Sequence, residues 1–236
     1  MNTQMHEPGI YSFNGFSQNV RAVFSGKPFT REDRSLFFEK AGFTGCSLAL
    51  VHQVHGDHVL CITEDLIPSA DTQADGLLTN GSHIVLGIKT ADCLPVLFED
   101  PEKGVIGAIH AGWRGLKAGI LEKAVAKMSR VYGTVPGNVR AAIGPAIRGC
   151  CYEVGPEFKD FFPDYYRSGR QSGDSAEGGM FDPIGAAIDR LHKAGISPQN
   201  IADSGFCTVC RQDLFHSFRA HKTEERMLSM IARGMS

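Results

Sequence analysis

Two histidines and a cysteine stand out as residues able to hold a metal ion: His55 in QVHG, Cys93 in TADCLP and His110 in IHAGWRG. Each ends an apolar stretch beside glycine or proline, which predicts positions at strand ends, where α/β proteins gather reactive groups. Two imidazoles and one thiolate suit Zn²⁺, and three protein ligands leave a fourth position open for water or substrate. The three residues are far apart in the chain, so only the fold can assemble them.

Two neighbours of these residues are further candidates. Asp92, next to Cys93, is a candidate base or a group that orients a ligand, although a hydrogen-bonded carboxylate at a strand end is the simpler interpretation. In IHAGWRGL a strand is expected to pass through a glycine-rich turn into a helix, whose N–H groups and positive end favour an anion. Arg114 could grip phosphate or carboxylate in a bidentate manner, or pair with a surface carboxylate.

His55 has two histidine neighbours at three-residue steps, His52 and His58. Side chains of a regular strand alternate between its faces, so His52 and His55 are expected to point to opposite sides and not to share a metal. His58 comes after Gly56, in or beyond a turn. We therefore expect His52 on the other face and His58 at the rim of the site.

The remaining cysteines offer a weaker signal. The chain has seven cysteines, which we interpret as reduced thiols of a cytosolic protein. Cys207 and Cys210 form a C-x-x-C pair, a spacing used by zinc and redox sites. The sequence has no second C-x-x-C, so this pair is interpreted as two ordinary thiols near a strand end. Cys150 and Cys151 are expected to pack beside the turn at residues 152–155.

The elements that must position these residues follow from the spacing of apolar side chains. Strands are expected at 20–24, 46–54, 83–93, 94–100, 104–112 and 138–144, with 201–207 leading into another. Helices are expected at 31–43, at 116–132, at 156–162 and from Asp182-Pro183 to Gly195. A final helix is expected at the end of the chain, with Thr223 as its N-cap and with Glu224 and Glu225 near its positive N-terminal end. Residues 164–179 are polar and rich in glycine, which predicts a mobile surface loop.

Length and composition predict one soluble globular domain spanning residues 1–236, an α/β fold with mixed sheets. The formal net charge is −2, and Lys and Arg are scattered, so no basic stripe indicates a nucleic-acid partner. The first residues lack a basic start followed by an apolar run, so no signal peptide is expected. Apolar stretches are shorter than the ~18 residues of a membrane span. These observations favour a cytoplasmic protein without a membrane partner, and leave its oligomeric state open.

Six segments resemble, in order, the YfiH family, also called the laccase-domain or multicopper polyphenol oxidase family. They are QVHG, ADGLLT, TADCLPVLF, GAIHAGWRGL, IGPAIRGCCYEVGPE and DLFHSFRA, between about residues 45 and 230. Some members are described as purine nucleoside phosphorylases, and one as a peptidoglycan editing factor. The resemblance implies a single-domain, mixed-sheet α/β sandwich like the catalytic domain of cytotoxic necrotizing factor.

The same resemblance implies a zinc ion held by His55, Cys93 and His110. It implies phosphorolysis of adenosine, inosine or guanosine to the free base and ribose 1-phosphate, with adenosine deamination and cleavage of methylthioadenosine reported for the same type of site. The expected partners are thus a purine nucleoside and phosphate. In the mechanism we expect, Arg114 and the helix start hold phosphate for attack on the ribose anomeric carbon.

The chain departs from the family pattern at both ends. The usual N-terminal TRxGGVS and SLNLG segments are missing, so the N-terminal segment, about residues 1–44, is shortened. Lys27 or Arg31 is the candidate replacement for the arginine that this stretch places near the substrate. Near the C-terminus, HKTEERM lacks the usual glycine before an arginine, but Arg226 matches that arginine and is expected at the substrate or phosphate.

Other functions stay open at this point. Cys93 as nucleophile and His110 as base would make a Cys/His hydrolase or amidase acting on peptidoglycan precursors, and a nucleoside-binding protein without activity is a third reading. Multicopper oxidases rely on H-x-H pairs, which the nine histidines of this chain do not form, so copper and laccase activity are less favoured than zinc. The H-x-E and P-C-x-x-C signature of zinc deaminases is also absent from the sequence.

Overall fold

The computed structural model describes residues 2–64, 66–169 and 178–235. Its first six-stranded sheet has the order β1 (Asn2–Glu7), β2 (Ile10–Asn14), β3 (Val20–Ser25), β15 (Met227–Arg233), β7 (Ile84–Thr90) and β4 (Ser47–Ala49). The second has the order β14 (Ile201–Asp203), β10 (Arg140–Ile143), β8 (Leu94–Asp100), β9 (Val105–Ala111), β6 (Gly76–Thr79) and β5 (Val59–Cys61). Both sheets mix parallel and antiparallel pairs.

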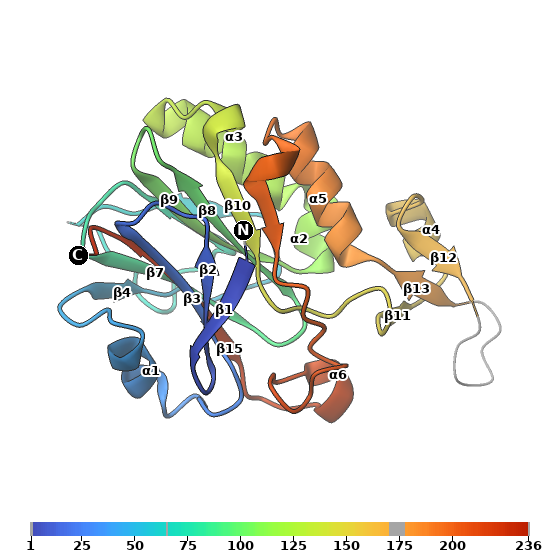
Figure 1. Cartoon of the computed structure of the whole chain (residues 1–236). Helices are drawn as coiled ribbons and strands as arrows, with labels where there is room; N and C mark the ends of the chain where they lie inside the picture. Colours follow the sequence, from blue (N-terminus) through green and yellow to red (C-terminus); the bar gives the residue numbers. More distant parts are fainter. Residues whose placement is uncertain (1, 65, 170–177, 236) are drawn as a thin grey trace.

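A third, three-stranded sheet has the order β11 (Glu153–Val154), β13 (Gly179–Phe181) and β12 (Tyr166–Ser168). Together with α4 (Phe158–Phe161) it projects from the body of the molecule (Figure 1). The other helices are α1 (Arg34–Lys40), α2 (Trp113–Ala118), α3 (Ile120–Tyr132), α5 (Pro183–Lys193) and α6 (Phe218–His221), with short 3₁₀ turns at Pro136–Asn138 and Pro198–Asn200.

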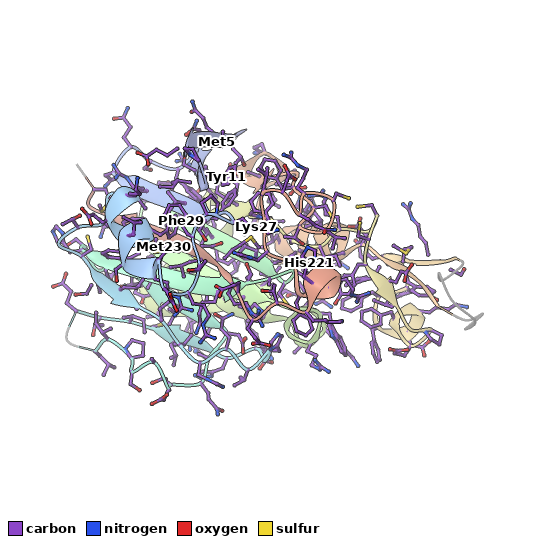
Figure 2. All side chains as sticks on the ribbon, turned by 90° about the horizontal axis from the view of Figure 1, so that it is seen from below. Met5, Tyr11, Lys27, Phe29, His221 and Met230 are labelled. Atoms are coloured by element: carbon purple, nitrogen blue, oxygen red, sulfur yellow. The ribbon has the colours of Figure 1, made fainter. Side chains whose placement is uncertain are left out.

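The two large sheets lie face to face between helical layers, an α/β sandwich of mixed sheets as predicted. One core fills the space between them, a second joins the outer face of the second sheet to α2, α3 and α5, and a third joins the first sheet to α1. Figure 1 shows α3 and α5 on one side of the strands and α1 on the other. Phe29 and Met230 belong to the third core and lie near α1 in Figure 2.

This layering explains why the central strands are apolar on both faces. In β7, Leu86 faces the core between the sheets and Val85 faces the core under α1. In β9, Ala108 faces the first sheet and Ile109 faces the helices. The predicted strands at 83–93 and 94–100 are confirmed as β7 and β8, but they belong to different sheets, so the chain crosses from one sheet to the other at residues 91–93.

Two predicted elements differ in extent. The helix expected at 116–132 begins at Trp113 and is divided at Gly119, whose φ of +83° is left-handed and ends α2. The apolar period continues across the break because residues 120, 121, 124, 125 and 128 are all buried. The strand expected at 46–54 ends at Ala49, and His52 only bridges to Gln73.

The expected final helix is wrong. Thr223 accepts a hydrogen bond from the Glu225 N–H through its hydroxyl, which closes a turn, and the chain then enters strand β15. β15 lies between β3 and β7 and is buried on both faces, so tertiary burial outweighs the helical preference of Met and Leu. The helix in this region, α6, lies before Thr223 instead.

The other predicted helices are present with shorter bounds: α1 spans 34–40 of the expected 31–43, α4 spans 158–161 of the expected 156–162, and α5 spans 183–193. Asp182 caps α5 by accepting the Gly185 N–H, and Gly195 follows its end with a φ of +95°. Of the loop expected at 164–179, residues 166–168 form β12, while residues 170–177 lie outside the described residues. Among the residues that are described, no helix is long and apolar enough to cross a membrane.

Candidate metal centre

His55, Cys93 and His110 converge in the folded chain. One ligand atom from each lies within 4.8 Å of the other two. Cys93 lies where the chain crosses between the sheets, directly before Leu94 of β8. His110 lies in β9 and pairs with Pro95 of β8, next to the Leu94–Ala111 pair. His55 comes from the loop between β4 and β5, not from a strand end. The fold therefore assembles the ligand set that the sequence suggested.

Gly112 makes this convergence sterically feasible. A Cβ at this position would lie 3.2 Å from His55 Cδ2, 3.3 Å from Cys93 Sγ and 3.7 Å from His110 Cε1. The glycine directly after β9 thus leaves the space in which the three side chains meet.

The backbone is strained at two points of the site. His55 has a φ of +60° and Asp92 a φ of +87°, in the left-handed region that costs energy for residues other than glycine. Such strain persists only where surrounding contacts hold it, and it is commonly found at functional sites. Here the two strained positions are one of the converging residues, His55, and the residue directly before another, Cys93.

Asp75 provides the contacts that hold His55 and His110, and sequence reasoning assigned it no role. Its carboxylate is fully buried and accepts backbone N–H groups from Val54 at 3.2 Å, His55 at 3.0 Å and Gly56 at 2.7 Å. It also lies 2.7 Å from His110 Nδ1. A carboxylate behind a ligating histidine orients the ring and fixes its tautomer, so Nε2 is left for Cys93 or a metal. The signal was the segment ADGLLT, which contains this aspartate.

The His110 imidazole and the Cys93 thiol stabilise each other's charged forms. Burial opposes ionisation of Cys93, but hydrogen bonds from His110 and His55 outweigh it and lower the pKa of the thiol from 9.0 to about 6. Burial likewise opposes protonation of His110, but Asp75 and Cys93 raise its pKa from 6.5 to about 9. Near neutral pH the metal-free site therefore holds a thiolate, the form that binds metals.

Two imidazoles and one thiolate fit a metal ion well. Catalytic zinc sites use three protein ligands of these types, and copper also accepts two histidines and a cysteine. The donor set therefore indicates a metal without deciding which. Of the neighbouring histidines, His52 lines the same cavity but is not in this group, and His58 lines a separate surface pocket rather than the rim of the site.

Asp92 uses both carboxylate oxygens in structural contacts. Oδ1 accepts the Thr208 hydroxyl at 2.6 Å, and Oδ2 accepts the backbone N–H of Arg219 at 2.7 Å. These bonds tie the turn that carries Cys93 to the loop at Thr208 and to helix α6. The arrangement agrees with the simpler interpretation, a hydrogen-bonded carboxylate at a strand end.

The three side chains open into a cavity of about 800 Å³ with a marked excess of positive charge. Among the described residues that line it, seven are Lys or Arg and two are Asp or Glu. The pKa of Lys89 indicates that the cations lie close together. Burial lowers this pKa most, and repulsion by Arg34, Arg31 and Arg226 lowers it further. Cations that are crowded together and outnumber the neighbouring carboxylates are suited to an anionic ligand.

Arg114 and Arg226 both line this cavity, as does Arg31. The guanidinium of Arg114 lies 4.5 Å above the Trp113 ring, and Trp113 itself packs on Phe158 at 5.0 Å. Arg226 donates to the backbone carbonyl of Thr223 at 2.8 Å.

The helix that begins beside Arg114 is only six residues long, so the positive end expected of a longer helix is small here. Of the two candidates for the missing N-terminal arginine, Arg31 lines the cavity, while the Lys27 ammonium donates to the Gln212 carbonyl.

Residues 26–234 match the family model described as multi-copper polyphenol oxidoreductase laccase. The chain is 36% identical over 191 residues to a protein of Aquifex aeolicus named purine nucleoside phosphorylase, covering 80% of this chain and 84% of that one. It is 36% identical over 220 residues to purine nucleoside phosphorylase YfiH of Escherichia coli, covering 91% and 86%. The crystal structure of YlmD from Geobacillus stearothermophilus superposes with a TM-score of 0.88 at 26% identity and covers 98% of both chains.

Proposed function

The chain belongs to the multi-copper polyphenol oxidoreductase laccase family, whose relatives include proteins named purine nucleoside phosphorylases, and on this premise we propose that it is a zinc-dependent purine nucleoside phosphorylase. The reaction converts adenosine, inosine or guanosine and phosphate into the free base and ribose 1-phosphate. One observation carries the proposal: the cavity with excess positive charge opens directly beside His55, Cys93 and His110.

The crowded cations form the phosphate end of this cavity. Lys89 lies on β7, and Arg226 immediately precedes Met227, which pairs with Thr90 of β7. Arg31 and Arg34 come from the N-terminal segment, close enough to lower the pKa of Lys89. Binding phosphate would relieve this repulsion, and the cavity volume lies within the range of small-molecule sites, roughly 300–1,000 Å³. Arg114 lines the same cavity and provides a further cation for phosphate or the nucleoside.

The protein groups have distinct proposed roles. His55, Cys93 and His110 hold the zinc ion, which when bound would supply a Lewis acid that steadies negative charge on the substrate. Asp75 holds the His110 ring so that Nε2 faces the metal. Asp92 positions the Cys93 turn, because one of its oxygens accepts the Thr208 hydroxyl and the other accepts the Arg219 N–H.

In the reaction, an oxygen of phosphate forms a bond to the ribose anomeric carbon as the bond from that carbon to the purine breaks. The electron pair of the broken bond leaves with the base, which takes up a proton. The cations hold phosphate in place for this attack and so lower its entropic cost.

Product analysis on a panel of nucleosides tests the proposal. Protein of measured zinc content should release free base and ribose 1-phosphate from adenosine, inosine or guanosine only when phosphate is present. Cys93→Ala should lose both the zinc of this site and the activity. Full activity in a Cys93→Ala protein that holds no zinc at this site, or stoichiometric nucleoside binding without turnover by the zinc-loaded wild type, would contradict it.

The phosphate end has its own test. Lys89→Met removes one charge but keeps an apolar stem of similar length. We expect the KM for phosphate to rise at least about tenfold, the loss of one charge-assisted contact, with a smaller change in the KM for the nucleoside. The matched control is Lys159→Met, which alters an exposed lysine of α4. Equal KM values for phosphate in the two variants would place phosphate elsewhere.

A second candidate function is favoured by the order Cys93–His110–Asp75. The thiolate, the imidazole and the buried carboxylate are linked by hydrogen bonds as in cysteine hydrolases. Removal of zinc distinguishes the candidates, because a cysteine hydrolase or amidase keeps its activity with a chelator present and the phosphorylase does not. Deamination of adenosine remains an expectation of the family resemblance alone.

A further inference from the structure

Four cysteines outside the candidate metal centre converge at another place. Cys150, Cys151, Cys207 and Cys210 each offer a sulfur atom, and all four sulfur atoms lie within 4.8 Å of one another. Cys210 Sγ lies 3.6 Å from Cys150 Sγ and 3.4 Å from Cys151 Sγ, and all four are free thiols. The sequence offered only one C-x-x-C pair, and the fold supplies two further sulfur atoms from a loop some 60 residues earlier.

These separations match a tetrahedral metal site. With Zn–S bonds of about 2.3 Å, neighbouring sulfur atoms of a tetrahedron are about 3.8 Å apart. The separations of 3.4 and 3.6 Å, and the upper bound of 4.8 Å, lie around this value. A disulfide would need about 2.05 Å, so the sulfur atoms surround a common centre rather than forming bonded pairs.

Local backbone structure explains how adjacent cysteines can share one centre. On a strand, Cys150 and Cys151 would point to opposite faces. Here they lie in a turn in which the N–H groups of Cys151 and Tyr152 both donate to the carbonyl of Arg148, at 2.9 and 3.0 Å. The turn allows both thiols to point to the same side.

A backbone bridge brings the second pair beside this turn. Ala146 pairs with Cys207 in a parallel bridge, and the Thr208 N–H donates to the Ala146 carbonyl at 3.1 Å. The backbone N–H groups of Val209 and Cys210 donate to the Cys207 sulfur. N–H groups of a C-x-x-C turn aimed at the first sulfur stabilise a thiolate there, and a metal ion requires a thiolate.

We propose that Cys150, Cys151, Cys207 and Cys210 form a second metal site, a closed structural zinc site of four thiolates. Four thiolates favour zinc over hard cations, and four protein ligands leave no position for a substrate, which is the structural type of site. This proposal departs from the sequence-based interpretation of two ordinary thiols, and it is independent of the proposed phosphorylase activity.

The second zinc ion would brace one wall of the cavity. It joins the loop that leads to Tyr152, which lines the cavity, to the loop of Thr208, whose hydroxyl binds Asp92 beside Cys93. Arg148 adds to the same junction through a two-point ion pair with Asp203, at 2.7 and 2.9 Å. Removing this zinc is therefore expected to loosen the wall of the cavity without removing any ligand of the first metal.

Metal analysis of the full chain, purified with a reductant and without added chelator, tests the proposal. The wild type should contain two zinc ions per chain, Cys210→Ser one, Cys93→Ala one, and the double variant none. Cys46→Ser, a thiol outside both groups, is the matched control and should keep two. A wild type with one zinc ion that Cys210→Ser retains, or iron in place of the second zinc, would overturn the assignment.

A second measurement does not depend on the folding of a variant. When native wild-type protein is treated with iodoacetamide and analysed by mass spectrometry, the four cysteines should be protected together and become reactive together after zinc is removed. Ready alkylation of the exposed Cys150 and Cys210 in zinc-loaded protein, or a disulfide within the group, would refute the proposal. Either result would leave the phosphorylase proposal untouched.

Discussion

Replacing Asp75 by asparagine is the sharpest test of how the first site is held together. One carboxylate oxygen, Oδ1, faces the His55 N–H and His110 Nδ1, and the other accepts the N–H groups of Val54 and Gly56. An amide of the same size keeps one oxygen and turns the other into an NH₂ donor. In either orientation of the amide, its NH₂ group takes the place of an oxygen that accepted two hydrogen bonds, so two donors of the protein lose their acceptor.

The magnitude follows from these contacts. Hydrogen bonds to a charged group contribute roughly 1.5–3 kcal/mol each, so losing two costs about 3–6 kcal/mol. The loop at Val54 and His55 is exposed and can shift toward water, which places the expected loss of folding free energy near the lower bound, about 3 kcal/mol. The His110 ring also loses the group that fixes its tautomer, so zinc affinity should fall about 10–100-fold.

Two assays separate these effects. Urea unfolding of metal-free protein measures the stability, and competition with a chromophoric chelator measures the zinc affinity of the Cys93 site. Asp57→Asn is the matched control, because Asp57 lies in the same loop and its carboxylate forms an exposed ion pair with Lys123, worth at most about 1 kcal/mol. If Asp75→Asn and Asp57→Asn unfold at the same urea concentration and bind zinc equally well, Asp75 does not hold the site.

Gly112→Ala places a methyl group 3.2 Å from His55 Cδ2 and 3.3 Å from Cys93 Sγ. Because metal–ligand distances tolerate a change of only about 0.2 Å, the zinc affinity should fall by about tenfold or more. Gly137→Ala is the control, since Gly137 has open space around it, and equal zinc affinities of the two variants would count against the assembled site. In metal-free protein the pKa of Cys93 is lowered from 9.0 to about 6. Its thiolate therefore persists as the pH falls below 9 and becomes protonated only when the pH passes through about 6. Its alkylation rate should therefore be near its maximum at pH 7.5 and half of it near pH 6, whereas a midpoint near 9 would show an ordinary thiol. Asp182→Ala removes the N-cap of α5 and should lower the unfolding free energy by about 1 kcal/mol in urea; an unchanged midpoint would show that the cap contributes little.

Much of the fold could be predicted from the sequence because its signals are local. The Asp182-Pro183 start and Gly195 end of α5 depend on caps within one turn of the chain. The apolar runs at 84–90, 94–100 and 105–111 are strands, as expected of segments buried on both faces. Local pattern failed at 227–233, where a strand in the middle of a sheet carries residues that are equally suited to a helix.

The first site was only partly visible in the sequence. His55, Cys93 and His110 were identified from their types and surroundings, and the structure brings them together. Asp75 was overlooked because its segment, ADGLLT, marks the family resemblance but does not indicate which groups a lone aspartate before a strand contacts. Its role depends on the pairing of β6 with β9, through which the His110 N–H also donates to the Asp75 carbonyl at 2.7 Å.

The sequence by itself therefore determined which side chains are chemically suited to a metal, and where most helices and strands run. Only the tertiary structure decided which of them meet. It united Cys150 and Cys151 with Cys207 and Cys210 through the bridge between Ala146 and Cys207. The physical reason is that helix caps and apolar periods act over a few residues, whereas strand register and sheet crossings set the distance between residues far apart in the chain.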